Sequence, residues 1–582
     1  MTAESSEESQ ELVTGQAITR RDLMRGALST VLVASRVPLL AKSSVAQSAG
    51  RRGAVRSVNI MNFIRATEPR GPMDLIKPVR EQMALIKKYG FSATWLLQYD
   101  ALVEGPFVEF LKAEMPPDHE VGLWFEMNRH HVQDAGLEWR GRPDWEWDYH
   151  VPVAYSIGYT QEERRKLVDT AVATFKRTFG KDVKSVASWN LDAVSIAHFS
   201  DQHRVDAFGN CRDQLATDGF TIWGCPIAGY YPCRLNAWSP AQELKNQIST
   251  PMLRLLGQDP VYYYDNTIPY PDTMEPAWPS GQNTVFVDRF LDMIANKPTQ
   301  AFGYAQLGQE NSFGWPTMGK GFAMQMEKLA GKNSNGRGDL VIETMGETGR
   351  RFKRQFKMTP PQAQVMLEDP FGRTEVPERS VWYQSKSLRA NLHFRGSEFY
   401  LRDLHVYNDE FPQPFLVDTV KQHGIEQRLL AVLDGYHWSE NGADKQHPER
   451  RAKGRFVLVG EDGRQTRLSM KGLPVVTETA SSLQAQIPLV EGGSLLVSFR
   501  ERDIAFQLSG EPTSKSRLGL VFEWDPAKSA FKEVSADSLK YRFRDFDYAL
   551  QIGNGVATKT DKGVNIVSQK RGALKLVVGR QS

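Results

Sequence analysis

Side chains able to do acid–base or nucleophilic chemistry gather in residues 304–315. There an apolar run, 301–307, ends in Gly308, Gln309, Glu310 and Asn311. The run has the composition of a buried strand. A carboxylate at the mouth of a strand, beside amides and aromatic rings, can exchange a proton with a substrate or attack it. The segment therefore predicts a reacting group at the rim of a cleft.

Several strand-like runs upstream end in the same mixture of carboxylates, amides, arginine and tryptophan. In a sheet of parallel strands these ends meet on one face and can line a single pocket. Besides Gln309, Glu310 and Asn311, the residues that we expect at this pocket are Arg65, Trp124, Glu126, Asn128, Trp189, Asn190, Asp192, Asp213, Trp223, Asp265 and Trp315.

This mixture suits a carbohydrate substrate. Tryptophan rings stack on the apolar face of a sugar, while amides and arginine bind hydroxyls or an acidic substituent. Two carboxyl groups on either side of an anomeric carbon supply the acid and the nucleophile or base of glycoside cleavage. We predict Glu310 and Asp192 as this catalytic pair. Glu126, Asp213 and Asp265 are the next candidates, either as the true partner or as ligands of sugar hydroxyls.

Each of these residues also has a purely structural explanation. A carboxylate at a strand end often caps the following helix, and this applies to Asp192, Asp213, Asp265 and Glu310. Glu126 follows Trp124 and Phe125 in an apolar run, where a charge is costly unless it has a partner. Residues 145–150 and the pair His130 and His131 either line the cleft or pack a long loop. The sequence leaves these alternatives open.

The elements that must position these residues alternate between short apolar runs and amphipathic stretches from about residue 57 to about 320. This pattern predicts an α/β fold with parallel strands. Helices are expected at 72–89 and 160–178, the second opened by a capping box at Thr160 and Glu163. Strands are expected at 58–64, 93–97, 120–125, 185–189, 220–224, 261–264 and 301–307. That number is enough to close a barrel.

The sequence pattern changes after the predicted barrel. A helical stretch at 340–356 leads to a proline-containing segment, 359–377, which reads as a linker. Beyond it, short alternating runs separated by Gly, Asp and Ser turns are typical of an antiparallel β-sandwich. We therefore predict a barrel domain at 57–358 and a sandwich domain at 378–582.

The composition limits which classes of partner and cofactor we expect the chain to bind. The chain has 582 residues, of which 41% are hydrophobic and 24% charged, and a net charge of +3. So small a charge over this length gives no reason to expect nucleic acid or an anionic membrane. No Cys or His pair has the spacing of a structural zinc site, so no metal or other cofactor is expected. Cys225 and Cys233 could form a disulfide, or these two and Cys211 could remain free thiols.

The N-terminus reads as an export signal. Residues 19–25 carry Arg20 and Arg21 in a motif that resembles the twin-arginine signal, followed by a moderately apolar stretch, 26–40. Arg36 and Pro38 interrupt that stretch, which is too short for a stable membrane span. We expect residues 1–50 to engage the twin-arginine export machinery and the mature protein to be periplasmic or secreted.

Two segments carry a resemblance to a known family. Residues 91–97, Phe-Ser-Ala-Thr-Trp-Leu-Leu, and the tetrapeptide His119-Glu120-Val121-Gly122 resemble the polysaccharide deacetylase pattern of an ATFF-type strand followed by a HEIG-type strand. The resemblance covers about residues 57–320. It implies the (β/α)7 barrel that those deacetylases share with certain glycoside hydrolases.

The chain departs from the deacetylases at the residues that bind their metal. The family has an Asp-Asp pair after the first strand, where this chain has residues 62–65, Asn-Phe-Ile-Arg. It has two histidines where this chain has Trp124 and Asn128. The resemblance is therefore closer to the glycosidase branch, and it implies one catalytic carboxylate after the fourth strand and another after a late strand.

The sequence favours an exported glycoside hydrolase with two alternatives. One is a metal-dependent deacetylase or hydrolase that uses nearby carboxylates with histidines from the set His119, His130, His131 and His150. The other is a barrel that binds glycans without cleaving them. Bound metal in the purified protein would favour the first, and sugar binding without turnover would favour the second.

Overall fold

The structure is a computed structural model. It describes residues 56–579 except 69–70, 264–271, 335–339, 373–375, 436–452, 513–515, 524–530, 562 and 571. The predicted export segment and Asp265 lie outside the described residues, so both stay predictions. In the described part of the chain, no helix is both long enough and apolar enough to cross a membrane.

A nearly closed barrel of parallel strands forms the first domain, which confirms the predicted α/β barrel. The strands run in the order β10-β5-β4-β3-β2-β1-β11, and each pairs with its neighbours in parallel. The side-chain carbonyl of Gln306 accepts the Leu256 N–H at 2.8 Å and links the two ends of the path. The strands are β1 (Arg56–Ile64), β2 (Thr94–Leu97), β3 (Glu120–Trp124), β4 (Ser185–Ser188), β5 (Ala207–Cys211), β10 (Met252–Leu255) and β11 (Gly303–Leu307), with β12 (Leu340–Ile342) beside the start of β1.

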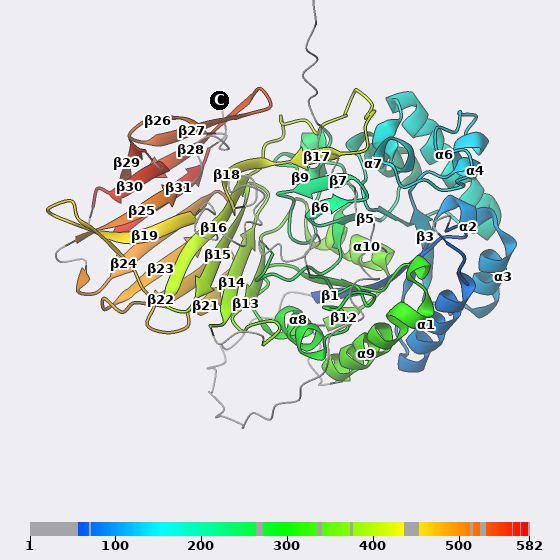
Figure 1. The fold of residues 1–582 in the computed structure, drawn as a ribbon, viewed down its shortest axis with the longest axis horizontal. Helices are drawn as coiled ribbons and strands as arrows, with labels where there is room; N and C mark the ends of the chain where they lie inside the picture. Colours follow the sequence, from blue (N-terminus) through cyan, green and yellow to red (C-terminus); the bar gives the residue numbers. More distant parts are fainter. Residues whose placement is uncertain are drawn as a thin grey trace, which may run out of the picture.

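Helices surround the barrel (Figure 1). The capping box predicted for the long helix α6 is confirmed, since Thr160 and Glu163 each bind the other's backbone N–H. Apolar side chains between helices and strands form a core that is separate from the one inside the barrel. The helices are α1 (Ile76–Tyr89), α2 (Tyr99–Val103), α3 (Gly105–Glu114), α4 (Arg129–Asp134), α5 (Val151–Ala154), α6 (Gln161–Phe179), α7 (Ala193–His203), α8 (Thr284–Asn296), α9 (Trp315–Ser334) and α10 (Met345–Gln355).

Two predicted barrel strands are wrong. Residues 261–263 form a turn, because Asp259 accepts the N–H groups of Val261 and Tyr262, and the barrel strand is β10, earlier in the chain. Residues 220–223 do form a strand, β7 (Phe220–Trp223), but it lies outside the barrel path. It pairs with β6 (Gln214–Thr217) and with β17 (Ile425–Arg428). The barrel strand that precedes this hairpin is β5.

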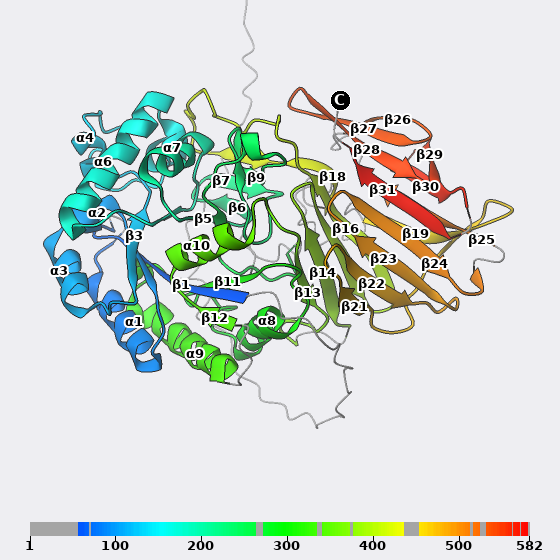
Figure 2. The ribbon, with the colours of Figure 1, turned by 180° about the vertical axis from the view of Figure 1, so that it is seen from behind.

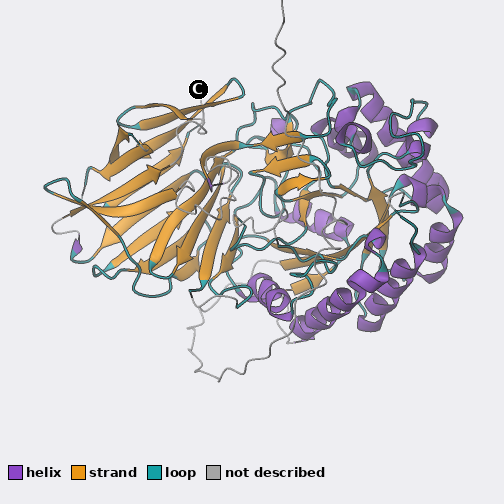
Figure 3. Cartoon of the chain, in the orientation of Figure 1, coloured by secondary structure: helices purple, strands orange, loops and turns teal. Residues whose placement is uncertain are grey.

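Two antiparallel sheets form the second domain, as predicted for a sandwich, and Figures 2 and 3 show this strand-rich half beside the helical one. Phe456 and Phe506, one from each sheet, contact each other across the core. One sheet contains β13 (Gln362–Met366), β14 (Glu378–Gln384), β15 (Leu388–Arg395), β16 (Glu398–Val406), β18 (Leu430–Asp434), β19 (Lys453–Gly460), β20 (Gln465–Arg467), β25 (Ser516–Glu523), β29 (Gly555–Thr560) and β30 (Gly563–Ser568).

The other sheet contains β21 (Val475–Glu478), β22 (Leu483–Pro488), β23 (Ser494–Phe499), β24 (Asp503–Ser509), β26 (Phe531–Val534), β27 (Ser538–Phe543), β28 (Phe546–Gly553) and β31 (Ala573–Val578). A separate two-stranded hairpin, β8 (Pro232–Cys233) and β9 (Asn236–Pro240), belongs to the barrel domain. Strand β13 lies within the segment that the sequence suggested as a linker. Cys211, Cys225 and Cys233 are buried free thiols.

A buried ionic network joins the two domains. Arg389 on β15 binds Asp213 of the barrel domain at 2.7 Å and Asp403 of the sandwich at 2.7 Å. His405 lies between Asp403 and Asp434, at 3.1 and 3.2 Å. Burial alone would lower the pKa of His405, but the Asp403 carboxylate beside it raises the pKa to about 9. The network therefore carries buried charges of both signs, and each depends on its partners.

Arg389→Met is expected to destabilise the protein by about 3–5 kcal/mol, because it leaves Asp213 and Asp403 without their shared cation in a buried place. Urea unfolding followed by circular dichroism measures this loss. The control is Arg395→Met on the same strand, whose side chain is 57% exposed and should matter little. Equal unfolding midpoints for the two variants would contradict this view of the interface.

Candidate active site

Three charged side chains meet at the carboxyl ends of the barrel strands. Arg65 follows β1, Glu126 follows β3 and Glu310 follows β11. The Arg65 Nη2 atom lies 2.9 Å from Glu126 Oε2 and 3.5 Å from Glu310 Oε2. The three side chains are 2%, 0% and 5% exposed, so their charges interact in a medium that screens them weakly.

Asn311 and Asp100 fix the backbone around Arg65. The Asn311 side chain accepts the Arg65 N–H at 2.9 Å and donates to the Arg65 carbonyl at 2.8 Å. The Asp100 carboxylate accepts the N–H groups of the next two residues, Ala66 and Thr67. The guanidinium of Arg65 then lies over the Trp147 ring, 3.9 Å from its centroid. Asn311 is thus placed to position Arg65, whereas its prediction as a sugar ligand is not tested.

Gly308 lets the chain change direction after β11, so that the side chain of Glu310 reaches the charged cluster. Gly308 has a φ of 110°, and a Cβ at this position would meet the Met61 carbonyl oxygen at 2.0 Å. Only glycine lets β11 pass this close to β1 and then change direction. Ser312 donates its hydroxyl hydrogen to Glu310 Oε1 at 2.8 Å and orients the carboxylate. The neighbouring Gln309 amide binds Glu275 and the Ala277 N–H.

The environment of Glu126 raises the pKa of its carboxyl group to about 7, and burial is the largest cause. The charges of Glu310 and Asp218 also raise this pKa, while Arg65 and Trp124 lower it. Among the described residues, neither Glu126 oxygen has a well-aligned hydrogen-bond donor, so the ion pair with Arg65 is its strong contact. A carboxyl group with such a pKa can donate a proton near neutral pH.

Asn190 offers hydrogen bonds that the described protein does not use. It follows β4 and is 1% exposed, and neither its amide oxygen nor its amide nitrogen has a hydrogen-bond partner among the described residues. Buried amides are normally paired, so a group in this state is a candidate ligand for a substrate hydroxyl. The sequence prediction for Asn190 is consistent with this placement.

The predicted aromatic wall divides into two parts. Trp124 stacks on Phe63 with ring centroids 4.1 Å apart, and Trp189 packs edge-on against both rings. These two tryptophans lie in the barrel core, where Trp124 also interacts with Glu126. Trp223 instead packs in a cluster with Tyr263 and Trp382, and Trp315 opens α9 and packs against helix residues.

Asp192 has a structural explanation. It is the N-cap of α7, with Oδ1 accepting the N–H groups of Val194 and Ser195 at 2.9 and 3.1 Å. Oδ2 accepts the hydroxyls of Ser156 and Ser195. Arg164 of α6 pairs with Oδ1 at 3.2 Å, and both side chains are fully buried. Every lone pair is thus used within the protein, which fits the capping alternative that the sequence left open.

Asp192→Asn is expected to destabilise the protein by about 3–5 kcal/mol, since it removes the partner of the buried Arg164. Turnover per folded molecule should change only a few-fold. Urea unfolding and active-site-normalised rates separate the two effects. The control Asp182→Asn removes an exposed carboxylate near the end of α6 and should alter neither. A large loss of turnover at unchanged stability would restore Asp192 as a catalytic residue.

Two further predicted residues are also held by the fold. Asp213 accepts the Cys225 N–H and binds Arg389, so it lies in the interface network rather than in the cluster around Arg65. Asn128 caps α4 by accepting the His131 N–H at 3.0 Å. The role of Asp213 and Asn128 in substrate binding stays a prediction. Both side chains already have partners within the protein, so their positions do not require a substrate.

The sequence places Asp218 in the polar loop before the predicted strand 220–224, without selecting it as a catalytic or binding residue. Asp218 sits at the turn of the β6–β7 hairpin with a φ of 45°, followed by Gly219, and its charge raises the pKa of Glu126. The available signal was the Asp-Gly dipeptide between two short strand-like runs, which is typical of a tight hairpin. The hairpin was not predicted, so a position near the strand ends gave Asp218 no specific role beside Glu126.

Three histidines of the metal-dependent alternative bind partners other than the charged cluster around Arg65. His119 binds the Trp95 indole and the Phe91 carbonyl, and His131 binds the Leu167 carbonyl beneath α4. His150 pairs with Asp148 at 2.7 Å. Within the part of the chain that the structure describes, three side chains able to share one metal ion meet at a single place, on α6 and α7.

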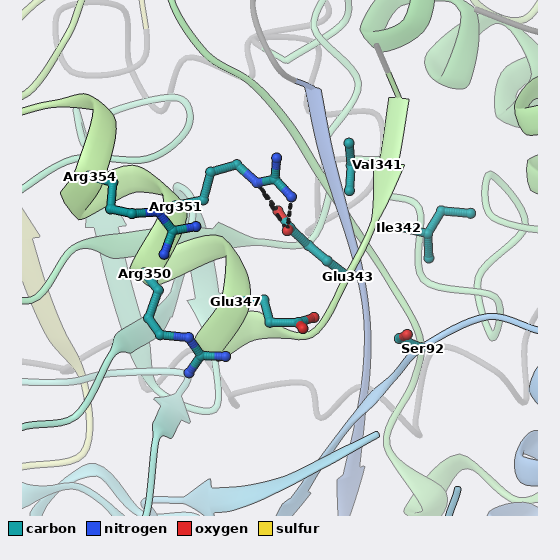
Figure 4. A pocket seen from close by; sticks show the side chains of 8 residues that line it. All are labelled: Ser92, Val341, Ile342, Glu343, Glu347, Arg350, Arg351 and Arg354. Carbon is teal, nitrogen blue, oxygen red and sulfur yellow. Dashed lines mark hydrogen bonds and ion pairs between the residues drawn. The ribbon is translucent and has the colours of Figure 1, made fainter. Parts of the chain in front are cut away.

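A groove of about 410 Å³ opens at the opposite end of the barrel (Figure 4). It lies beside β12, which pairs with the first residues of β1, whereas the Arg65 cluster follows the last residues of that strand. Its charges are largely paired: Arg351 binds Glu343 at 2.6 Å, and Arg350 binds Asp206 at 2.8 Å. The groove is lined by Ser92, Val341, Ile342, Glu343, Glu347, Arg350, Arg351 and Arg354.

Comparison with known proteins gives distant structural likenesses. No family model and no curated protein matches the chain. One similar solved structure is a protein assigned as a glycoside hydrolase/deacetylase from Parabacteroides distasonis, with 15% identity and a TM-score of 0.49. That match covers 65% of this chain and 91% of the other.

Two others are proteins assigned as polysaccharide deacetylases. The protein from Mycobacterium smegmatis has 11% identity and a TM-score of 0.33, with 55% of this chain and 96% of the other covered. The protein from Pseudomonas aeruginosa PAO1 has 10% identity and a TM-score of 0.33, with 52% and 93% covered. At such values these likenesses carry no argument about activity, and the fold assignment rests on the strand order itself.

Proposed function

We propose that this chain is a glycoside hydrolase whose catalytic pair is Glu126 and Glu310. The observation that carries the proposal is the placement of two buried carboxylates on one guanidinium nitrogen at the carboxyl ends of the barrel strands. Paired carboxyl groups in distinct environments are what glycoside cleavage requires. The proposal keeps the predicted Glu310 and replaces Asp192, whose oxygens are used by the fold, with Glu126.

The environments of the two carboxyl groups support different roles. Glu126, whose pKa is raised to about 7, is the acid that protonates the departing glycosidic oxygen. Glu310 is oriented by Ser312 and attacks the anomeric carbon as that bond breaks. Glu126, now ionised, then takes a proton from the water that releases the sugar from Glu310. Arg65 remains beside both groups and balances the negative charge that shifts between them.

The spacing of the pair supports retention of configuration. Both Oε2 atoms contact one nitrogen, at 2.9 and 3.5 Å, so their separation cannot exceed the sum of these distances. That limit includes the about 5–5.5 Å of retaining enzymes and only reaches the lower edge of the about 6.5–9.5 Å of inverting ones. We therefore expect the product to have the anomeric configuration of the substrate, which proton NMR of fresh product would measure.

The neighbours of the pair support a sugar as the substrate. Within the described residues, the side chain of Asn190 has a donor and an acceptor without partners, the pattern that a sugar hydroxyl satisfies. Trp189 directly precedes Asn190, and its ring packs against Trp124, so the two supply aromatic surface in this part of the barrel. The deacetylase alternative lacks such support, because Asn62, Trp124 and Asn128 stand where metal ligands would be needed, and Asn62 and Asn128 are engaged with Gln82 and His131.

The proposal is tested by a glycan-library hydrolysis screen with the full chain, in the presence and absence of EDTA. Release of reducing ends that survives EDTA and disappears in Glu310→Gln is the expected result. Activity that depends on metal would instead favour the deacetylase alternative. Saturable glycan binding with no turnover anywhere in the library would indicate a binding protein.

A further inference from the structure

A cluster of two histidines and an aspartate joins helices α6 and α7 on the outside of the barrel. Asp169 is on α6, and His198 and His203 are on α7. The Nε2 atoms of the two imidazoles lie 2.8 and 2.7 Å from the same atom, Asp169 Oδ1. One ligand atom from each of the three residues lies within 4.8 Å of the other two.

The helix geometry explains how these three residues converge. His198 and His203 are five residues apart, so at about 100° per residue their side chains project about 140° apart around α7. The two imidazoles can therefore approach one side chain of the neighbouring helix from different sides. Asp169 from α6 lies between them. The two rings are nearly perpendicular, with centroids 5.6 Å apart. Helix α7 ends at this point, since Arg204 adopts a left-handed conformation with a φ of 51°.

The exposure of the cluster allows an ion to enter. The side chain of Asp169 is 54% exposed, and those of His198 and His203 are 17% and 21% exposed. The histidines are therefore held by packing, while the carboxylate can turn. Two imidazole nitrogens and one carboxylate oxygen form a donor set that suits Zn²⁺ and related divalent transition metals, with water in a fourth position.

We propose that Asp169, His198 and His203 form a divalent transition-metal site, of Zn²⁺ type, that clamps α6 to α7. These two helices flank β4, whose end carries Trp189 and Asn190. The buried Arg164–Asp192 ion pair ties the same helices near the start of each. The metal ties them again further along, so its role is to stabilise this side of the barrel, at a distance from the proposed reaction.

The test is equilibrium dialysis of the full, tag-free chain against Zn²⁺, together with thermal unfolding at increasing Zn²⁺ concentration. The wild type should bind one Zn²⁺ per chain at this site, and Tm should rise by several degrees, because a ligand that binds only the folded state stabilises it. The variant His198→Gln/His203→Gln should lose that ion and the rise in Tm. The control His130→Gln changes an exposed histidine outside the cluster and should keep both.

Asp169→Asn provides a second, isosteric variant on the other helix, and it should weaken Zn²⁺ binding at least tenfold. The proposal is wrong if the wild type binds no Zn²⁺ at about 1 mM free metal. It is equally wrong if the double histidine variant binds Zn²⁺ and gains Tm as the wild type does. Neither measurement depends on enzymatic activity, so the outcome is independent of the proposed glycosidase function.

Discussion

Glu310→Gln is expected to lower kcat by at least about 10⁴-fold, because an amide cannot form and release a glycosyl ester at the anomeric carbon. Glutamine has nearly the same shape, and the Ser312 hydroxyl can still bind its side-chain oxygen, so the fold should persist. Steady-state rates on any cleaved substrate give the loss, and circular dichroism checks that the variant is folded.

The matched control for Glu310 is Glu343→Gln. Glu343 is also buried and also paired with an arginine, Arg351, but it lies at the opposite end of the barrel. It should leave kcat unchanged in folded protein. A second variant, Glu310→Ala with added azide, should recover turnover, since a small anion can take the place of the missing nucleophile. Wild-type kcat in Glu310→Gln would exclude Glu310 from the chemistry.

Glu126→Gln is expected to lower kcat/KM by about 10²–10⁴-fold, the usual contribution of a general acid. In the wild type the acid must be protonated, and its pKa is raised to about 7, so the rate should fall as the pH rises through about 7. The variant should lack this decline. Aryl glycosides with good leaving groups need no proton and should lose much less rate. A decline near pH 7 that survives in the variant would assign the acid to another group.

The raised pKa of Glu126 also predicts how the unfolding free energy depends on pH. The carboxyl of Glu126 has an ordinary pKa of 4.5, and its folded-state pKa is raised, so the unfolded chain loses this proton first as the pH rises. The contribution of Glu126 to the unfolding free energy should therefore fall between about pH 4.5 and 7, by on the order of 3 kcal/mol. Urea unfolding of wild type and Glu126→Gln across this range tests the direction, and parallel pH profiles would contradict it.

The barrel could be predicted from the sequence because local patterns determine its strands and helices. The apolar run before Glu310 and the capping box at Thr160 are both short-range signals, and both were interpreted correctly. The strands β5 and β10 were missed because neither is a continuous apolar run: β5 contains Gly209 and Asn210, and β10 contains the buried Arg254. Tertiary burial, which a short run does not show, determined these two strands.

The pairing of carboxylates could not be predicted from the sequence, because it depends on long-range contacts. Glu126 looked too costly to bury, and the residue that compensates its charge, Arg65, lies 61 positions upstream. The capping bonds of Asp192 are local, but Arg164, which completes its environment, comes from another helix. Strand-end position alone therefore did not separate a capping carboxylate from one that faces a substrate.

The most direct test of the central claim, that Glu126 and Glu310 cleave a glycosidic bond, is mass spectrometry of a partially acetylated oligosaccharide after incubation with the full chain. The account predicts shorter oligosaccharides that keep their acetyl groups, and unchanged starting material with Glu310→Gln. Products of the original chain length that have each lost acetyl groups would contradict it and assign the protein to deacetylation.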